Sequence, residues 1–225
     1  MVISIGNLPL KNIKADIFLH PVKYKDSITY EPMSEEAVIA LIAKYFTYDV
    51  VPEEIQLYFD EMDDGYLFSE SNFDEFDLEK LDRGEIIIGR DILLNPRFEN
   101  IKKFLFILKE YGGFLIKGVD FSEFTPSDYE LNEILNTKKE LKLEEIAELD
   151  SFDGSVVYEC EDFEVVKDNE ILCSTQFLIA NKITSSTILV DGVEKKVKKV
   201  ENLKGVFGII YKPTTDYPFK KVKIN

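Results

Sequence analysis

The chain is poor in the residues that carry most enzymatic and metal chemistry. Its 225 residues include one histidine, His20, and two cysteines, Cys160 and Cys173. A structural zinc site needs four Cys or His ligands and an iron–sulfur cluster usually needs four thiolates, so this chain alone supplies neither. We expect the two cysteines to be buried or half-buried free thiols in a reducing compartment, with a disulfide as the alternative.

Membrane and export segments are also missing. No run of 18 apolar residues occurs, so we expect no transmembrane helix and no direct membrane insertion. The N-terminal stretch "MVISIGNLPLKNIKAD" has no basic region followed by a long apolar run, and we expect no signal peptide. These features predict a cytoplasmic protein that reaches a membrane only through partner subunits.

No motif for phosphate, dinucleotide or acyl chemistry is present. The chain lacks G-x-x-x-x-G-K-[ST], G-x-G-x-x-G and G-x-S-x-G. A Ser–His–Asp or Cys–His arrangement would have to use His20. This residue ends the strand-like stretch "KADIFLHP", and ligands often bind at strand ends of open α/β sheets. Nothing local supports catalysis, however, and we expect a partly exposed loop histidine.

The 43 acidic residues do not define a site either. Ten of the 24 residues in 59–82 are acidic, and aromatic residues are interleaved with them. The stretch "DEMDDGYLFSES" has the early acids of a calcium loop but not its terminal bidentate Glu, so we expect an exposed acidic helix–loop. A glycosidase-like carboxylate pair stays open, because so many acids offer too many candidate pairs. We therefore assign no catalytic, cofactor-binding or metal-binding residue, and no cofactor.

Charge is plentiful and unevenly placed. The formal net charge is −16, which repels phosphate backbones and argues against nucleic-acid binding. Residues 181–225 hold ten lysines and four acids, whereas the first 180 residues carry a net charge of −22. This asymmetry suggests two units with different surfaces, the alternative being an ordinary solvated lysine-rich β surface. With 45% apolar residues the chain can bury a substantial core.

The first part of the chain reads as alternating strands and helices. Short β-branched strands are expected at 2–5 and 15–19, followed by a helix that Ser34 would cap and a second helix that begins near Pro52. The clearest pattern is "GEIIIG", a helix over 95–113 with Ile101, Phe104, Leu105 and Leu108 on one face, and then "FLIKGVDF". This strand–helix–strand order predicts a right-handed parallel crossover.

The second part reads as a connector and a small β unit. Short helices are expected in 122–150, one beginning at Ser127 and one in "KLEEIAELD". After Gly154, the short strands expected at close spacing are "SVVYEC", "DFEVV", "STQFLIA", "STILVDGVEKKVKKV" and "GVFGIIY". Asp191-Gly192 is a turn dipeptide between alternating segments and predicts a hairpin.

A series of motifs resembles a known family. The motifs, in order along the chain, are "ADIFLHPV", "SEEAVIALIAKYF", "FDEMDDGYLFSESNFDEFDLEKL", "GEIIIGRDILLNPRFENIKKFLFILKEYGGFLI", "YELNEI", "DGSVVYECEDFEVVKDNEILCSTQFLIANKI" and "LKGVFGIIYKPTTDYPFKKVKI". Together they resemble the C-terminal half of the large G (NuoG-like) subunit of bacterial respiratory complex I, in its epsilonproteobacterial form. The similarity covers most of the chain and depends on the order of the motifs.

The resemblance implies a fold and a role. That subunit has the fold of molybdopterin oxidoreductases, which implies a Rossmann-like α/β domain over 1–125, a helical connector over 126–150 and a small β-barrel-like domain over 151–225. This region of the family generally binds no molybdopterin and packs on the peripheral arm as a scaffold. The cysteine-rich iron–sulfur domain of a full G subunit has no counterpart here, so no cluster ligand carries over, and His20 would lie at an empty ancestral ligand site.

The sequence therefore predicts an accessory or scaffold subunit, or a fragment, of a complex I-like NADH (or other donor):quinone oxidoreductase. Its expected partners are other peripheral-arm subunits, contacted through the acidic segment 59–82 and through Lys195, Lys196, Lys198 and Lys199. The alternative is a small molybdopterin- or nucleotide-binding enzyme that uses an α/β crevice near Gly6, His20 and Gly89. A free-standing regulatory binding protein is the third reading.

Overall fold

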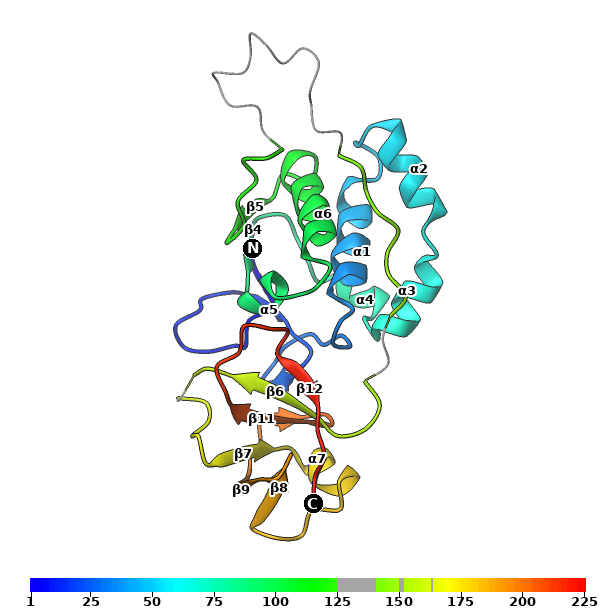
Figure 1. Cartoon of the computed structure of the whole chain (residues 1–225). Coiled ribbons are helices and arrows are strands. Elements are labelled where there is room, and N and C mark those ends of the chain that lie inside the picture. Colours follow the sequence, from blue (N-terminus) through cyan, green and yellow to red (C-terminus); the bar gives the residue numbers. More distant parts are fainter. Residues whose placement is uncertain (125–140, 150–151, 163) are drawn as a thin grey trace.

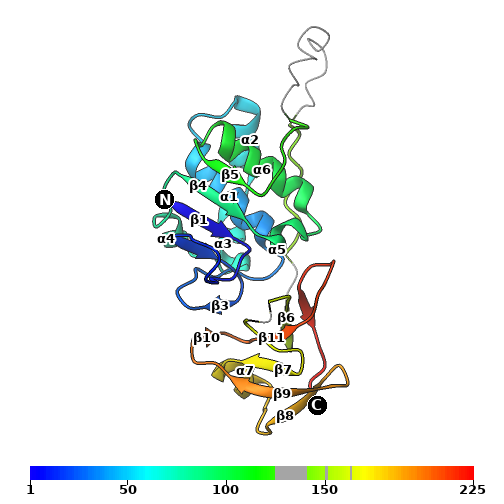
Figure 2. The same ribbon diagram turned by 90° about the vertical axis from the view of Figure 1, so that its left-hand side faces the viewer.

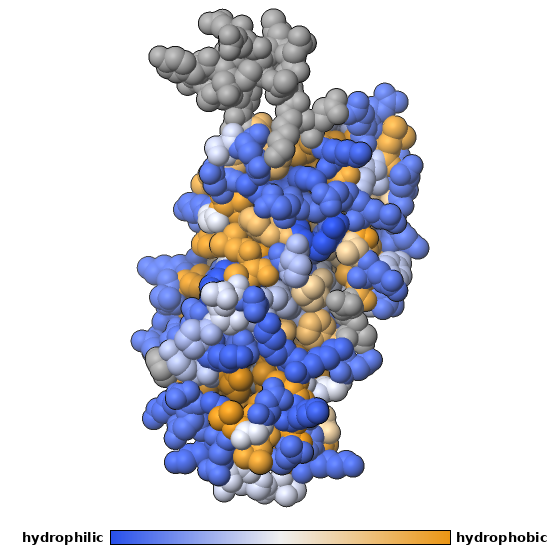
Figure 3. Space-filling model, viewed as in Figure 1, coloured by the Kyte–Doolittle hydropathy of each residue, from blue (hydrophilic) through white to orange (hydrophobic). Residues whose placement is uncertain are grey.

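The described residues form two main sheets and a two-stranded ribbon between β3 and β10, and all the helices except α7 gather around the first main sheet (Figures 1 and 2). The computed structural model describes residues 1–124, 141–149, 152–162 and 164–225. Within these residues it is a mixed α/β structure with a four-stranded parallel sheet and a curled six-stranded sheet. The face seen in Figure 3 is mainly hydrophilic, with hydrophobic residues showing in separate patches.

The first sheet is parallel throughout. It consists of β1 (Val2–Ile5), β2 (Ile17–Leu19), β4 (Glu85–Ile88) and β5 (Leu115–Lys117), in the order β2-β1-β4-β5. The strands expected in 2–5, 15–19, 84–89 and 114–121 are confirmed. Their inward Ile residues are buried, as β-branched residues in a covered parallel sheet usually are.

Two long helices pack on each other beside this sheet. They are α1 (Glu35–Thr47) and α6 (Phe98–Glu110). The apolar face predicted for the helix over 95–113 is confirmed. Its four side chains, Ile101, Phe104, Leu105 and Leu108, are all fully buried. Ser34 stands at the N-cap of α1 but does not cap it with its side chain, since its hydroxyl donates to the carbonyl of Glu31 instead.

Shorter helices complete the first unit. They are α2 (Glu53–Glu61), α3 (Asp64–Ser71), α4 (Glu75–Leu78) and α5 (Arg90–Leu93). The acidic segment 59–82 is an exposed helix–loop, as expected, and two of its acids have local roles. Asp63 accepts a hydrogen bond from the N–H of Tyr66 at the start of α3, and Asp74 accepts one from Phe76 at the start of α4.

The second sheet is mixed and has six strands. They are β6 (Val156–Cys160), β7 (Glu170–Cys173), β8 (Thr187–Val190), β9 (Val193–Lys199), β11 (Phe207–Tyr211) and β12 (Phe219–Lys221), in the order β12-β6-β11-β7-β9-β8. The hairpin between β8 and β9 is confirmed. Asp191 and Gly192 have φ values of 48° and 83°, and two successive positive φ angles are what a type I′ hairpin turn requires.

Three expected elements are wrong. "STQFLIA" forms helix α7 (Thr175–Ala180), because Ser174 Oγ accepts the N–H of Phe177 at 2.9 Å and the Phe177 ring is fully buried. The described part of "DFEVV" is a turn, with Val165 donating to the carbonyl of Asp162. Residues 141–149 are not helical, although the sequence predicts a helix in "KLEEIAELD". The helix expected at Ser127 lies outside the described residues.

The segment between β2 and α1 belongs partly to the second unit. Its strand β3 (Lys23–Tyr24) pairs antiparallel with β10 (Leu203–Lys204). Val22 of this segment, and Leu8 between β1 and β2, are buried in the same apolar cluster as the β6 and β12 side chains. The two sheets are therefore joined by shared packing as well as by the chain.

Both cysteines are free and buried, as expected. Burial raises the pKa of Cys160 to about 11 and that of Cys173 to about 12, so both thiols stay protonated near neutral pH. Among the described residues, no helix is both long and apolar enough to cross a membrane.

Candidate functional site

His20 lies at the carboxyl end of β2 and is completely buried. The expectation of a partly exposed loop histidine is wrong, because β6 and β12 of the second sheet cover this strand end. The Tyr158 ring stands perpendicular to the imidazole with centroids 5.1 Å apart, and the Phe219 ring lies 6.0 Å away.

The imidazole is held in one tautomer by two partners. The N–H of Val22 donates to His20 Nδ1 at 3.0 Å, so Nδ1 is an acceptor and the proton of the neutral ring lies on Nε2. Nε2 lies 2.9 Å from Asp91 Oδ2 and donates to it. The hydroxyl of Tyr158 donates to the other oxygen of Asp91 at 3.3 Å. Both oxygens of this buried carboxylate are thus occupied by protein groups.

Asp91 was not singled out from the sequence. It lies in α5, which follows β4 directly, and its side chain is 71 residues away from His20 along the chain. The carboxyl ends of β1, β2 and β4 meet at one edge of the parallel sheet, which brings the two residues together. The third partner, Tyr158, belongs to the other sheet, and no local pattern points to it.

A second buried carboxylate lies nearby at the start of α1. Glu35 Oε1 accepts the hydroxyl of Tyr217 at 2.5 Å, and Oε2 accepts the Asn95 amide at 2.7 Å. Burial raises the pKa of Glu35 from 4.5 to about 7, and the neighbouring charge of Asp91 adds to the increase. The carboxyl group therefore holds its proton to a higher pH than an exposed glutamate does.

Tyr30 joins the same region with an unusual hydroxyl. Its side chain is fully buried, and its oxygen has no hydrogen-bond partner among the described residues. Burial raises the pKa of Tyr30, and the charges of Glu35 and Asp91 raise it further. The buried polar cluster thus contains two carboxyl groups and three tyrosines at the contact between the two sheets.

Gly6 and Gly89, which the sequence places at the expected crevice, allow close packing of the backbone. Gly6 has a φ of +75°, and a Cβ added there would lie 2.6 Å from Ile92 Cγ1. A Cβ on Gly89 would lie 2.1 Å from the carbonyl oxygen of Gly6. The structure therefore brings Gly6, His20 and Gly89 together at the sheet edge, as expected, but each of them contacts protein atoms there.

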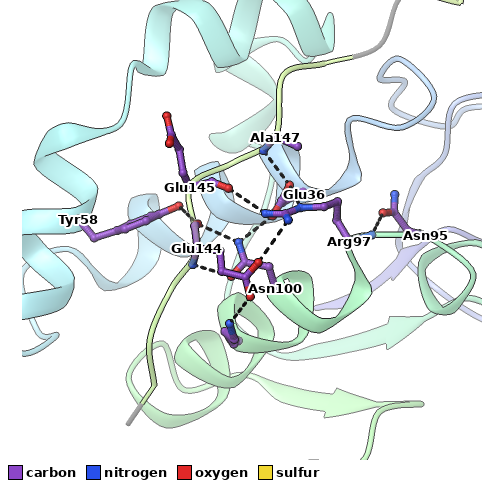
Figure 4. Close-up of polar contacts among 9 residues, drawn as sticks. Glu36, Tyr58, Asn95, Arg97, Asn100, Glu144, Glu145 and Ala147 are labelled. Atoms are coloured by element: carbon purple, nitrogen blue, oxygen red, sulfur yellow. Dashed lines mark hydrogen bonds and ion pairs between the residues drawn. The ribbon is translucent and has the colours of Figure 1, made fainter.

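Residues 141–149, which we call the docked segment, form a separate polar site with three helices (Figure 4). The Asn100 side chain on α6 donates to the carbonyl of Glu144 at 3.0 Å and accepts its N–H at 2.9 Å. The Tyr58 hydroxyl on α2 donates to the same carbonyl at 2.7 Å. One residue of the docked segment thus has its backbone donor and acceptor matched by side chains.

The rest of this site is a buried carboxylate with an arginine. Glu36 on α1 accepts from Arg97 at 3.0 Å, from the Asn100 amide at 2.7 Å and from the N–H of Ala147 at 3.2 Å. Arg97 also donates to the carbonyl of Glu145 at 2.8 Å, and the bond to Glu36 raises the pKa of Arg97. These contacts explain why the docked segment is extended, since its backbone groups are satisfied by other elements.

A hollow of about 410 Å³ opens between α1 and the acidic segment 59–82. Two pairs of its charged and polar side chains bond to each other, Lys44 with Asp64 and Tyr48 with Asp60. Lys44 Nζ donates to the carbonyl of Phe59 at 2.6 Å and lies 2.7 Å from Asp64, and the Tyr48 hydroxyl donates to Asp60 at 2.6 Å. It is lined by Leu41, Lys44, Tyr45, Tyr48, Asp60, Asp64, Phe68, Glu75 and Leu78.

The lysine surface expected on the hairpin is smaller than the sequence suggests. Lys195 is buried and bonded to Asp168, and Lys198 lies 3.5 Å from Glu170 on the neighbouring strand. Lys196 and Lys199 are exposed. Lys195 is therefore removed from the expected contact surface.

In the part of the chain that the structure describes, no group of three or more His, Cys, Asp or Glu side chains is arranged to hold a metal ion. Comparison with protein-family models, with curated proteins and with solved structures finds no significant match.

Proposed function

We propose that the chain is a scaffold subunit, or a fragment of one, of a complex I-like NADH (or other donor):quinone oxidoreductase. It carries no redox cofactor of its own in this proposal and acts through contacts with other peripheral-arm subunits on the cytoplasmic face of the inner membrane. The ordered series of motifs described above supports the family, and the coarse α/β arrangement is compatible with it.

The finer fold belongs to the same proposal. The parallel sheet with its helices would be the Rossmann-like domain, and the curled six-stranded sheet would be the small β-barrel-like domain. The order of the two sheets along the chain supports this assignment, because it is the order that the resemblance implies.

One observation carries the non-catalytic role. At the strand end where an α/β enzyme would open a crevice, His20 and Asp91 bond to each other and to Tyr158 of the second sheet, and all three are buried. A substrate could reach these groups only if the two sheets separated. Their chemistry is therefore used to hold the two units together.

The test is affinity purification of the tagged chain from its native membranes in mild detergent, with mass spectrometry of the accompanying proteins. Peripheral-arm subunits of complex I in near-stoichiometric amounts are the expected result. A chain that purifies alone with an ultraviolet-absorbing ligand would instead support the molybdopterin- or nucleotide-binding enzyme. A lone monomer without ligand would support the free-standing binding protein, and either outcome overturns the proposal.

A further inference from the structure

The docking site binds the backbone of residues 141–149. Four of its side chains, Glu36, Tyr58, Arg97 and Asn100, define it. They contact the N–H or C=O groups of Glu144, Glu145 and Ala147. Main-chain hydrogen bonds of this kind supply affinity wherever proteins bind extended peptides.

Part of the docking site is held by the helices themselves. Glu36 and Asn100 lie on α1 and α6, which belong to the first core, and each is 2% exposed with the docked segment in place. The Glu36 carboxylate already accepts hydrogen bonds from Arg97 and from Asn100. Loss of the Ala147 N–H would leave this buried charge paired, so the helices can present the site to another chain.

The docked segment, by contrast, is peripheral. None of its nine residues is buried, and its Leu141, Leu143, Ile146 and Leu149 side chains are only partly covered by the first core. One side chain adds charge matching, since the Glu144 carboxylate lies 2.9 Å from Lys103 Nζ and 3.3 Å from Arg97 Nη1. A segment that occupies the docking site therefore needs an extended backbone, a few half-buried leucines and one acidic side chain.

We propose that the docking site is a peptide-binding surface for an extended, acidic, leucine-containing segment of another protein chain. Residues 141–149 are its built-in competitor and occupy the site until such a segment displaces them. The positive charges of Lys103 and Arg97 select an acidic peptide over a basic one. The purified chain should bind such a peptide whichever assembly the chain belongs to.

The experiment uses a fluorescein-labelled peptide with the sequence of residues 141–149 and full chains in which those residues are replaced by Gly and Ser. We expect fluorescence anisotropy to show saturable binding to the replaced chain. Binding to the unmodified chain should be at least ~10-fold weaker, because the tethered segment competes at an effective concentration on the order of millimolar.

Two matched comparisons distinguish specific recognition from non-specific binding. In the replaced chain, Asn100→Ala should weaken the peptide at least ~10-fold, whereas Asn202→Ala, on the exposed turn before β10, should not. A peptide N-methylated at Glu144 loses the N–H that Asn100 accepts and should bind weakly. N-methylation at Glu145, whose N–H donates to no described residue of the site, should be tolerated.

Two results would overturn the proposal. One is that the replaced chain is folded by circular dichroism but does not bind the peptide up to millimolar concentration. The other is that Asn100→Ala leaves the binding unchanged. If the replaced chain does not fold, the intact chain carrying Ala147→Pro lacks only the N–H given to Glu36 and should bind the peptide more tightly than the unmodified chain. A dimer of the unmodified chain that the free peptide dissociates would assign the site to a second copy and overturn the assignment to another protein.

Discussion

The Nε2 atom of His20 donates a hydrogen bond to Asp91 Oδ2 at 2.9 Å, in a place that solvent does not reach. His20 follows β2 and Asp91 lies in α5 directly after β4, at the same edge of the parallel sheet, and Tyr158 of the other sheet completes the contact. A neutral imidazole, a carboxylate and a phenol that satisfy one another in this way make the cluster a structural contact between the two units.

We expect Asp91→Ala to lower the free energy of unfolding by about 2–4 kcal/mol, because it leaves the His20 N–H and the Tyr158 hydroxyl buried without an acceptor. Urea unfolding followed by circular dichroism measures this. Glu61→Ala, at an exposed position of α2, should change stability by less than about 0.5 kcal/mol. Equal stability of the two variants would show that the contact contributes nothing.

Glu35 should make the protein less stable as the pH rises from about 4.5 to about 7. Its folded pKa of about 7 exceeds the ordinary value of 4.5, so the folded chain binds more protons in this range and loses stability as they leave. The loss has an upper bound of about 3 kcal/mol at 1.36 kcal/mol per pKa unit. Tyr217 and Asn95, which face the carboxyl group, and the nearby charge of Asp91 complete its surroundings.

The measurement for Glu35 is urea unfolding at several pH values, with Glu35→Gln as the comparison. The amide cannot titrate, so the difference in stability between the two chains should change across the range from pH 4.5 to 7 and stay flat above it. Parallel curves for the two chains would contradict the assignment of this dependence to Glu35.

Gly89→Ala should cost about 3 kcal/mol or more, because its Cβ would lie 2.1 Å from the backbone oxygen of Gly6. Gly65→Ala is the matched control, since Gly65 lies within α3 and its Cβ would meet its nearest neighbour at an ordinary 3.5 Å. The control should be neutral or stabilising by up to about 1 kcal/mol, as alanine favours helices. Thermal unfolding of both variants tests the pair.

The exposed lysines of the hairpin provide a test of the scaffold proposal. Lys196→Ala together with Lys199→Ala should reduce co-purification of peripheral-arm subunits, and the reduction should be larger at low salt, because screening already weakens the contact at high salt. Substituting the buried Lys195 is unsuitable, since it would break the contact with Asp168. Unchanged co-purification of the double variant would exclude this surface as a contact.

Short apolar stretches mark the limit of sequence interpretation in this chain. The residues 175–180 have a composition that suits a strand or a helix equally, and their spacing does not separate the two. The helix forms because Ser174 caps it and because the Phe177 ring packs against the backbone of Gly208. A Cβ added at Gly208 would lie 2.9 Å from Phe177 Cζ. Ser174 is the first residue of "STQFLIA", but Gly208 lies on β11 and is not visible in the stretch.

The sequence alone determined the strands of the parallel sheet, the buried face of α6 and the hairpin at Asp191-Gly192, because periodicity and turn preference are local properties. It also placed His20 at a strand end. Only the tertiary structure decided that His20 is buried, that Asp91 and Tyr158 are its partners, and that residues 141–149 are extended. These outcomes depend on side chains 40 or more residues away along the chain, such as Asn100 for Glu144 and Asp91 for His20.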